Sequence, residues 1–193
     1  MMNAHSSNLM NEARRLLRER LLSHAKGDPN DEALASILSS WLTGGGAMPE
    51  CLGLDPISFR QLLDHHFPDL ETPAAPPRGS ADATRSDEYA ELLTLLLQHR
   101  AGATVSETWM AGIVAAGCMA SDHLWQDLGL WNRGELSALM QRNFPELAGR
   151  NVKDMKWKKF LYKQLCDAEG IYTCRSPSCE VCADYQNCFG PEE

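Results

Sequence analysis

The sequence LLDHHFPDL at residues 62–70 returns in altered form as LMQRNFPEL at residues 139–147. Both copies begin with two apolar residues and end with the order Phe, Pro, an acidic residue and Leu. The proline in each copy indicates the end of a helix. The turn Leu-Gly-Leu at 52–54 likewise matches 128–130, and residues 22–27 resemble residues 97–102. Chance similarity between leucine-rich helices is the alternative, but the shared Leu-Gly-Leu and Phe-Pro motifs between the helices favour an internal duplication.

Around this repeat, apolar residues recur at intervals of three and four, which is typical of amphipathic helices. The pattern predicts helices over residues 9–22, 33–41 and 57–66, the last with Pro56 in its first turn. A final helix is expected over about 153–167, before Gly170. We therefore predict an all-α fold, in which duplicated three-helix units pack face to face as a helical bundle. An irregular C-terminal Cys-rich loop follows.

Residues 71–87 separate the two copies and contain three prolines and four alanines, with little to bury. The sequence thus predicts a first helical unit (1–70), a linker (71–87) and a second helical unit (88–147). A basic helix and a four-cysteine loop make up the remainder (148–193).

The overall composition excludes several classes of protein. The 193 residues carry a formal charge of −8, which argues against a generic nucleic-acid binder. No apolar run is long enough to span a membrane, and residues 1–11 lack the features of a secretory signal. We expect a cytoplasmic protein, a compartment in which clustered cysteines usually bind metals.

Four cysteines near the C-terminus have the spacing Cys174-x4-Cys179-x2-Cys182-x5-Cys188. Such a segment cannot fold by burial, so a bound metal would supply its ordering energy. Thiolates suit iron–sulfur clusters and zinc alike, and the first part of the spacing matches plant-type ferredoxins. The spacing favours iron–sulfur only modestly over zinc. An iron–sulfur electron-transfer protein and a zinc-stabilised interaction module are therefore both open at this point.

Other ligand candidates each have a structural alternative. Cys166 would be a spare ligand or a small buried hydrophobe, and His123 a ligand or an ordinary structural histidine. His65 and His66 are expected on two faces of a helix and not as a chelating pair. We find no catalytic triad order and no phosphate loop, so the sequence predicts a binding protein and not an enzyme.

A basic segment precedes the cysteines. Residues 150–163 hold six basic side chains against Asp154, a net charge of +5. The lysines are Lys153, Lys156, Lys158, Lys159 and Lys163. They could steer an oxyanion toward the metal or dock an acidic partner, and the alternative is a solvated helix face.

The stretch DMKWKKFLYKQLC at 154–166, the cysteine loop, CFGPEE at 188–193 and DHLW at 122–125 resemble the NifQ family of nitrogen-fixation proteins. The resemblance implies a role in assembling the iron–molybdenum cofactor of nitrogenase. It also implies an iron–sulfur cluster, of 3Fe-4S or 4Fe-4S type, bound by Cys174, Cys179, Cys182 and Cys188, and so favours iron over zinc.

In that family molybdenum is taken up, as a Mo-Fe-S cluster or as bound molybdate. It is passed to the nitrogenase iron protein and the cofactor-assembly scaffold complex. For this chain these are expectations, and no nucleic-acid or membrane partner is expected. The sequence leaves open a homodimer and any chemical processing of molybdate.

Overall fold

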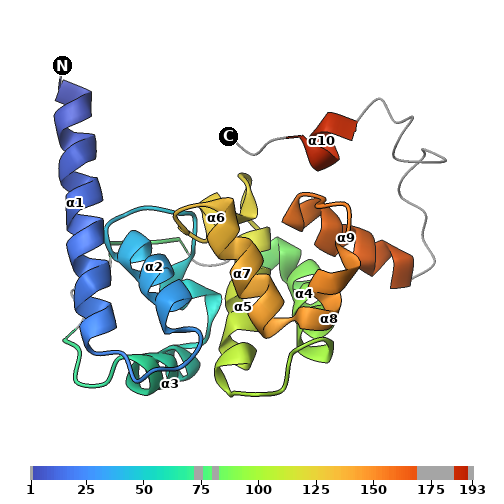
Figure 1. The fold of residues 1–193 in the computed structure, drawn as a ribbon, viewed down its shortest axis with the longest axis horizontal. Helices are drawn as coiled ribbons and strands as arrows, with labels where there is room; N and C mark the ends of the chain where they lie inside the picture. Colours follow the sequence, from blue (N-terminus) through green and yellow to red (C-terminus); the bar gives the residue numbers. More distant parts are fainter. Residues whose placement is uncertain (1, 72–75, 80–82, 169–184, 191–193) are drawn as a thin grey trace.

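The computed structural model describes residues 2–71, 76–79, 83–168 and 185–190, and these are helices and loops without a strand (Figure 1). The fold is therefore all-α over the described residues, as predicted. The longer helices are α1 (Met2–Ser23), α2 (Asp31–Leu42), α3 (Pro56–His66), α4 (Ser86–Gln98), α5 (Ser106–Cys118), α7 (Arg133–Asn143) and α9 (Trp157–Ala168). The shorter ones are η1 (Glu50–Gly53), η2 (Ala83–Arg85), α6 (Leu124–Asp127), α8 (Pro145–Arg150) and α10 (Tyr185–Phe189).

Helix α5 forms the centre of the core. All but one of its residues are buried, and it packs against α4, α6, α3 and η1. Its small residues permit this, because a Cβ atom on Gly112 would come 2.7 Å from Leu54 and one on Gly117 2.8 Å from Leu128. Neighbouring elements can therefore reach the helix surface from several sides.

The ends of the helices follow local chemistry. Asp55 caps α3, since its carboxylate accepts hydrogen bonds from the backbone N–H groups of Ile57 and Ser58, both at 3.0 Å. Pro56 occupies the first turn, as the sequence indicates. Asn132 caps α7 in the same way by accepting from the N–H of Glu135 at 2.9 Å.

The two halves of the chain have the same order of elements. In the first half α1, α2, η1 and α3 follow one another, and in the second α4, α5, α6 and α7. The repeated Phe-Pro positions adopt nearly identical backbone angles, with φ −135° and ψ 59° at Phe67 and φ −134° and ψ 57° at Phe144. Gly53 and Gly129, the centres of the repeated Leu-Gly-Leu turns, both have positive φ. These matches agree with the repeat in the sequence, while the duplication itself stays a prediction.

Part of the expected linker is held against the first half. The Arg78 guanidinium donates to the carbonyl groups of Trp41, Gly45 and Gly46, at 3.0, 2.9 and 3.2 Å. Residues 72–75 and 80–82 lie outside the described residues, and the domain boundaries stay a prediction.

None of the helices among the described residues is long and apolar enough to cross a lipid bilayer. Helix α1 extends beyond the rest of the bundle at its N-terminal end, and α10 lies above α9 in the view of Figure 1.

Candidate metal centre

Of the four motif cysteines, Cys188 is described by the structure. It lies in α10 and is half-buried. Cys174, Cys179 and Cys182 lie outside the described residues. The geometry of the site therefore begins from the elements that hold Cys188.

The main chain of Cys188 is attached to the start of α9. Its carbonyl oxygen accepts a hydrogen bond from the N–H of Lys156 at 2.8 Å, and Lys156 Nζ donates to the carbonyl of Gln186 at 3.3 Å. Lys156 thus binds α10 through both its backbone and its side chain. This places one predicted ligand beside the predicted basic segment.

A tightly bonded loop at residues 151–156 presents that N–H group. The Asn151 side chain accepts from the N–H of Met155 at 2.8 Å and donates to the Met155 carbonyl at 2.9 Å. Asp154 has φ 54°, a strained value for a residue other than glycine, and its carboxylate binds Arg133 at 2.5 and 2.8 Å. The loop explains why α9 begins at Trp157 and not near the expected residue 153.

Helix α9 is docked through side chains spaced four residues apart. Lys158 Nζ donates to the carbonyl of Ala120 at 2.8 Å and forms an ion pair with Asp127. The hydroxyl of Tyr162 bonds to Glu88 and reaches the Cys118 carbonyl at 3.5 Å. The Ala120 carbonyl, just beyond the C-terminal end of α5, thereby accepts a hydrogen bond from α9.

Burial determines the electrostatics of this contact. It raises the pKa of Asp127 even though the Lys158 ammonium acts to lower it. Burial also raises the pKa of the Cys118 thiol to about 12. The hydrogen bond from Arg85 lowers the pKa of Glu88 despite the desolvation of that carboxyl group.

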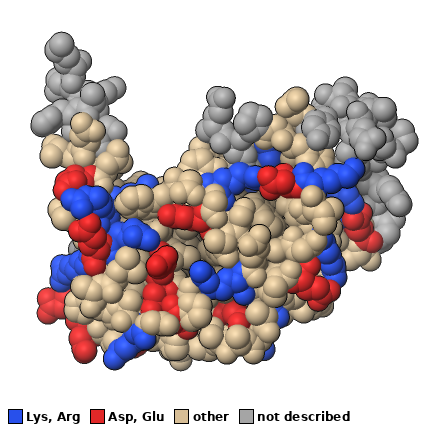
Figure 2. Space-filling view, in the orientation of Figure 1, with Lys and Arg blue, Asp and Glu red and all other residues tan. Residues whose placement is uncertain are grey.

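The predicted steering lysines differ in their surroundings. Lys153, Lys159 and Lys163 are exposed and Lys156 is half-buried, whereas the side chain of Lys158 is only 16% exposed. Lys163 pairs with Asp167 at 2.5 Å. Figure 2 shows Lys and Arg side chains in a band across the part of the face where Figure 1 draws α6 and α9. Because its side chain is largely buried, Lys158 holds α9 in place, while the other four lysines contribute to the basic surface.

The two additional ligand candidates lie on separate elements. Cys166 is half-buried in the last turns of α9, directly before the cysteine segment. His123 directly precedes α6 at its N-cap position, where its backbone N–H donates to the side chain of Gln126 at 3.2 Å. A ligand role for either residue stays a prediction.

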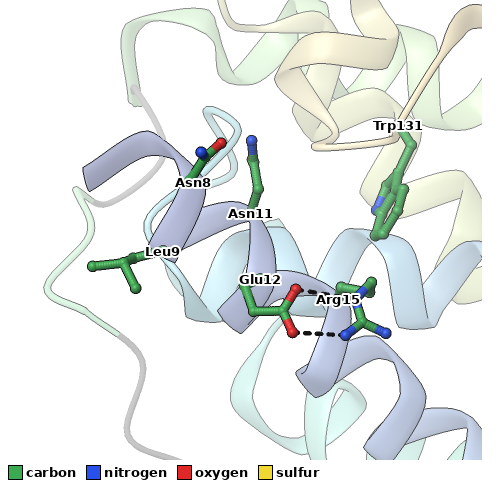
Figure 3. Close-up of a pocket in the computed structure, with 6 residues that line it drawn as sticks. All are labelled: Asn8, Leu9, Asn11, Glu12, Arg15 and Trp131. Carbon is green, nitrogen blue, oxygen red and sulfur yellow. Dashed lines mark hydrogen bonds and ion pairs between the residues drawn. The ribbon is translucent and has the colours of Figure 1, made fainter. Parts of the chain in front are cut away.

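A shallow groove of about 580 Å³ lies between α1 and Trp131 (Figure 3). It is lined by Asn8, Leu9, Asn11, Glu12, Arg15 and Trp131. Its charged side chains bind each other, since Arg15 donates to Glu12 at 2.7 Å (Figure 3). The groove offers a surface and no reactive group.

Sequence reasoning missed Asn151, Arg133 and Asp154 as supports of the site. Arg133 and Asp154 are 21 positions apart, so no local spacing links them. Asn151 carries the one available signal, because asparagine often bonds to nearby backbone at turns.

A protein family matches this chain over the residues that form the candidate site. The family model described as NifQ matches residues 33–190, which include the basic segment and all four motif cysteines. The chain belongs to the NifQ family. Its match to the NifQ model starts within α2, so α1 and most of the groove lining lie outside it.

Individual NifQ proteins align over most of their length. The chain is 47% identical to protein NifQ of Azotobacter vinelandii over 170 residues, covering 82% of this chain and 87% of that protein. It is 38% identical to protein NifQ of Klebsiella pneumoniae over 163 residues, covering 77% and 93%. No solved structure matches the chain. NifQ membership associates the protein with nitrogen fixation.

Proposed function

We propose that this protein is an iron–sulfur molybdenum carrier that delivers molybdenum for assembly of the nitrogenase iron–molybdenum cofactor. The observation that carries the proposal is the NifQ match across the four-cysteine motif and the basic segment that holds Cys188. Its proposed recipients are the nitrogenase iron protein and the cofactor-assembly scaffold complex. It acts as a carrier and donor in the cytoplasm, and not as an enzyme.

The donor set fits an iron–sulfur cluster of 3Fe-4S or 4Fe-4S type. Cys174, Cys179, Cys182 and Cys188 supply four thiolates, the ligands such clusters use. Cys188 is half-buried and attached to the body through the Lys156 N–H, so one ligand is positioned independently of the metal. Such a cluster, when bound, supplies sulfide ligands for molybdenum.

The surface around Cys188 suits capture of an anion. Molybdate carries two negative charges, and the whole chain carries −8, so a general attraction is absent. Lys153, Lys156 and Lys159 provide a local positive field beside the proposed site. The same lysines would dock an acidic surface of a recipient after loading.

Metal analysis of oxygen-free protein from molybdate-fed cells tests the proposal directly. Iron, molybdenum, zinc and acid-labile sulfide are measured per chain, in the wild type and with all four motif cysteines changed to Ala. We expect iron and sulfide in cluster amounts, together with molybdenum that is lost in the variant. Iron with a reversible redox couple and no molybdenum would instead indicate an electron-transfer protein. A colourless zinc protein would indicate an interaction module.

The role of the lysines is tested with Lys153→Glu, Lys159→Glu and Lys163→Glu together, and Lys156 is kept because its side chain contacts α10. Lys158 is left unchanged because its ion pair with buried Asp127 holds α9. We expect slower molybdenum loading or transfer with unchanged iron content, and a weaker effect at high salt.

A matched control makes the same change of charge elsewhere, with Arg20→Glu, Arg60→Glu and Arg142→Glu at exposed positions. Equal loading and transfer in the two triple variants would show that the lysines act only through net charge, or not at all.

A further inference from the structure

A second group of metal-binding side chains lies where the α1–α2 loop meets the end of α3. One ligand atom from each of Asp28, His65 and His66 lies within 4.8 Å of the others. The carboxylate of Asp31, in the first turn of α2, lies 2.6 Å from Nδ1 of His66. The adjacent histidines differ in exposure, as expected for two faces of a helix, yet His65 reaches Asp28 in the loop and His66 reaches Asp31 in α2.

The group is enclosed on most sides. The side chain of His66 is fully buried, and those of Asp28 and Asp31 are 8% and 6% exposed. His65 is 40% exposed and its ring stacks edge-on against Trp109, with ring centroids 5.5 Å apart. The site therefore has one open approach, beside His65.

The hydrogen bonds of His66 allow two proton arrangements. Nε2 lies 2.9 Å from the Ser106 hydroxyl, which also accepts a hydrogen bond from Asn30 Nδ2 at 3.0 Å. In the first arrangement Ser106 donates to Nε2, and the Nδ1 proton points to Asp31. In the second, Nε2–H donates to Ser106, and the lone pair of Nδ1 faces the Asp31 carboxylate.

At 2.6 Å the contact between Nδ1 and the Asp31 carboxylate has the length of a hydrogen bond, so the first arrangement describes the metal-free protein. In the second, two acceptors face each other, so a cation would have to replace the proton. The Asp31 carboxylate would then move outward, because two ligand atoms of one tetrahedral ion lie ~3.4 Å apart. The second arrangement also matches the usual support of a metal-bound histidine, whose other ring nitrogen donates to a fixed acceptor. Ser106 is such an acceptor because Asn30 is itself held by Asn143, through amide hydrogen bonds of 2.7 and 2.9 Å.

We propose that Asp28, Asp31, His65 and His66 form a binding site for a divalent transition-metal cation, separate from the four-cysteine segment. Two carboxylates balance the charge of a dication, and the imidazole and carboxylate ligands suit zinc, iron(II), cobalt(II) or manganese(II). The thiolate set at the C-terminus selects softer partners, so the two sites differ in ligand chemistry.

A bound ion would connect three elements of the fold. In the metal-bound state the ion would tie the α1–α2 loop to α3 and, through Ser106, to α5.

Cobalt(II) titration distinguishes this site from the cysteines. The protein is the full chain with Cys174, Cys179, Cys182 and Cys188 changed to Ser, so the result does not depend on the proposed carrier function. We expect one cobalt per chain with visible d–d bands and without the near-ultraviolet thiolate-to-cobalt bands. Quenching of Trp109 fluorescence should accompany binding.

Asp28→Asn and His65→Ala change the partly exposed rim and leave His66 in place. Each should weaken cobalt binding at least ~10-fold, and Ser106→Ala about 10-fold or more through loss of the second hydrogen bond. His99→Ala is the matched control, since His99 binds a single carboxylate, that of Glu146, at 3.2 Å. It should leave the affinity unchanged.

If the serine variant does not fold, the same titration is followed on the intact chain by paramagnetic broadening of assigned imidazole resonances. His65 and His66 should broaden at cobalt concentrations that leave His99 sharp. Three results would overturn the proposal. The first is equal broadening of His65, His66 and His99, and the second is full cobalt affinity in Asp28→Asn and His65→Ala. The third is a cobalt dissociation constant above ~1 mM, which corresponds to a binding free energy smaller than about 4 kcal/mol.

Discussion

Cys118 and Cys188 show how position determines what a thiol can do. Cys118 is buried at the end of α5, where desolvation holds its pKa at about 12. Cys188 is half-buried in a short helix beside a basic loop. A buried thiol of high pKa is a poor ligand and nucleophile, so Cys118 serves as a core residue.

Alkylation should separate these cysteines. At pH 8 a pKa of about 12 leaves roughly one Cys118 in 10⁴ as thiolate, and burial blocks access as well. Native protein treated with iodoacetamide should therefore stay unmodified at Cys118, as read by peptide mass spectrometry. In denaturant it should react fully, and rapid modification in the native state would contradict the burial.

At the scale of the element, α9 joins the body to the proposed metal segment. Lys158 attaches it to Asp127 of α6 and to the Ala120 carbonyl just beyond α5, and Tyr162 attaches it to Glu88 of α4. The loop before it holds Cys188. These contacts bring together residues distant in sequence.

Lys158→Met should destabilise the protein by about 2–3 kcal/mol, because it leaves the 1%-exposed carboxylate of Asp127 without its cation. Urea unfolding should show a lower midpoint with an unchanged slope. Lys159→Met, one residue along and exposed, is the control and should change stability by no more than about 0.5 kcal/mol. Equal effects would mean that the ion pair contributes nothing.

Asn151→Ala should weaken the attachment of Cys188 to the loop at residues 151–156, because the change removes both hydrogen bonds to Met155 that stabilise this loop. On the proposed function, iron should be lost to a chelator several-fold faster than from wild type, in anaerobic protein. Asp55→Ala removes the cap of α3 and costs about 1 kcal/mol, in a helix that supplies no residue to this loop. Iron loss as fast in Asp55→Ala would attribute the effect to general destabilisation.

How far the sequence predicts these elements depends on the range of the interactions. Helix α3 was predictable to within a residue because Asp55 and Pro56 mark its start locally. The start of α9 was misplaced by four residues because Arg133, distant in sequence, stabilises a loop with Asp154 at positive φ. The basic segment was recognisable by composition, but only the fold separates Lys158 from its exposed neighbours. The cysteine motif was found from spacing alone, and its ligand role stays a prediction.

For the whole molecule, a buried polar network joins the two halves. His66 and Asp31 come from the first half, Ser106 and Asn143 from the second, and each is buried. Asn30 connects them through Ser106 and Asn143. Because these residues are buried and bonded across both halves, the protonation of the network affects the stability of the entire fold.

Stability should fall on acidification below about pH 6.5, the ordinary pKa of histidine. Burial lowers the pKa of folded His66, so the unfolded chain binds the proton first and folding loses stability as pH falls through the folded pKa. His66→Asn places there the residue found at the matching position, Asn143, and should flatten this dependence. Urea unfolding at several values from pH 5 to 8 gives the free energy of unfolding as a function of pH. An equally steep pH dependence in the variant would mean that other groups cause the effect.

The hydrogen bond between Lys156 and Cys188 has a kinetic consequence. Residues 169–184 are joined covalently to α9 at one end and to the attached α10 at the other. On the proposed function, a metal that leaves one thiolate still faces the remaining three at an effective concentration in the millimolar range. Escape into solution would thus require several bonds to open before any recloses. A recipient that replaces the thiolates one at a time never meets that barrier, so cargo would be retained in solution and handed over on contact.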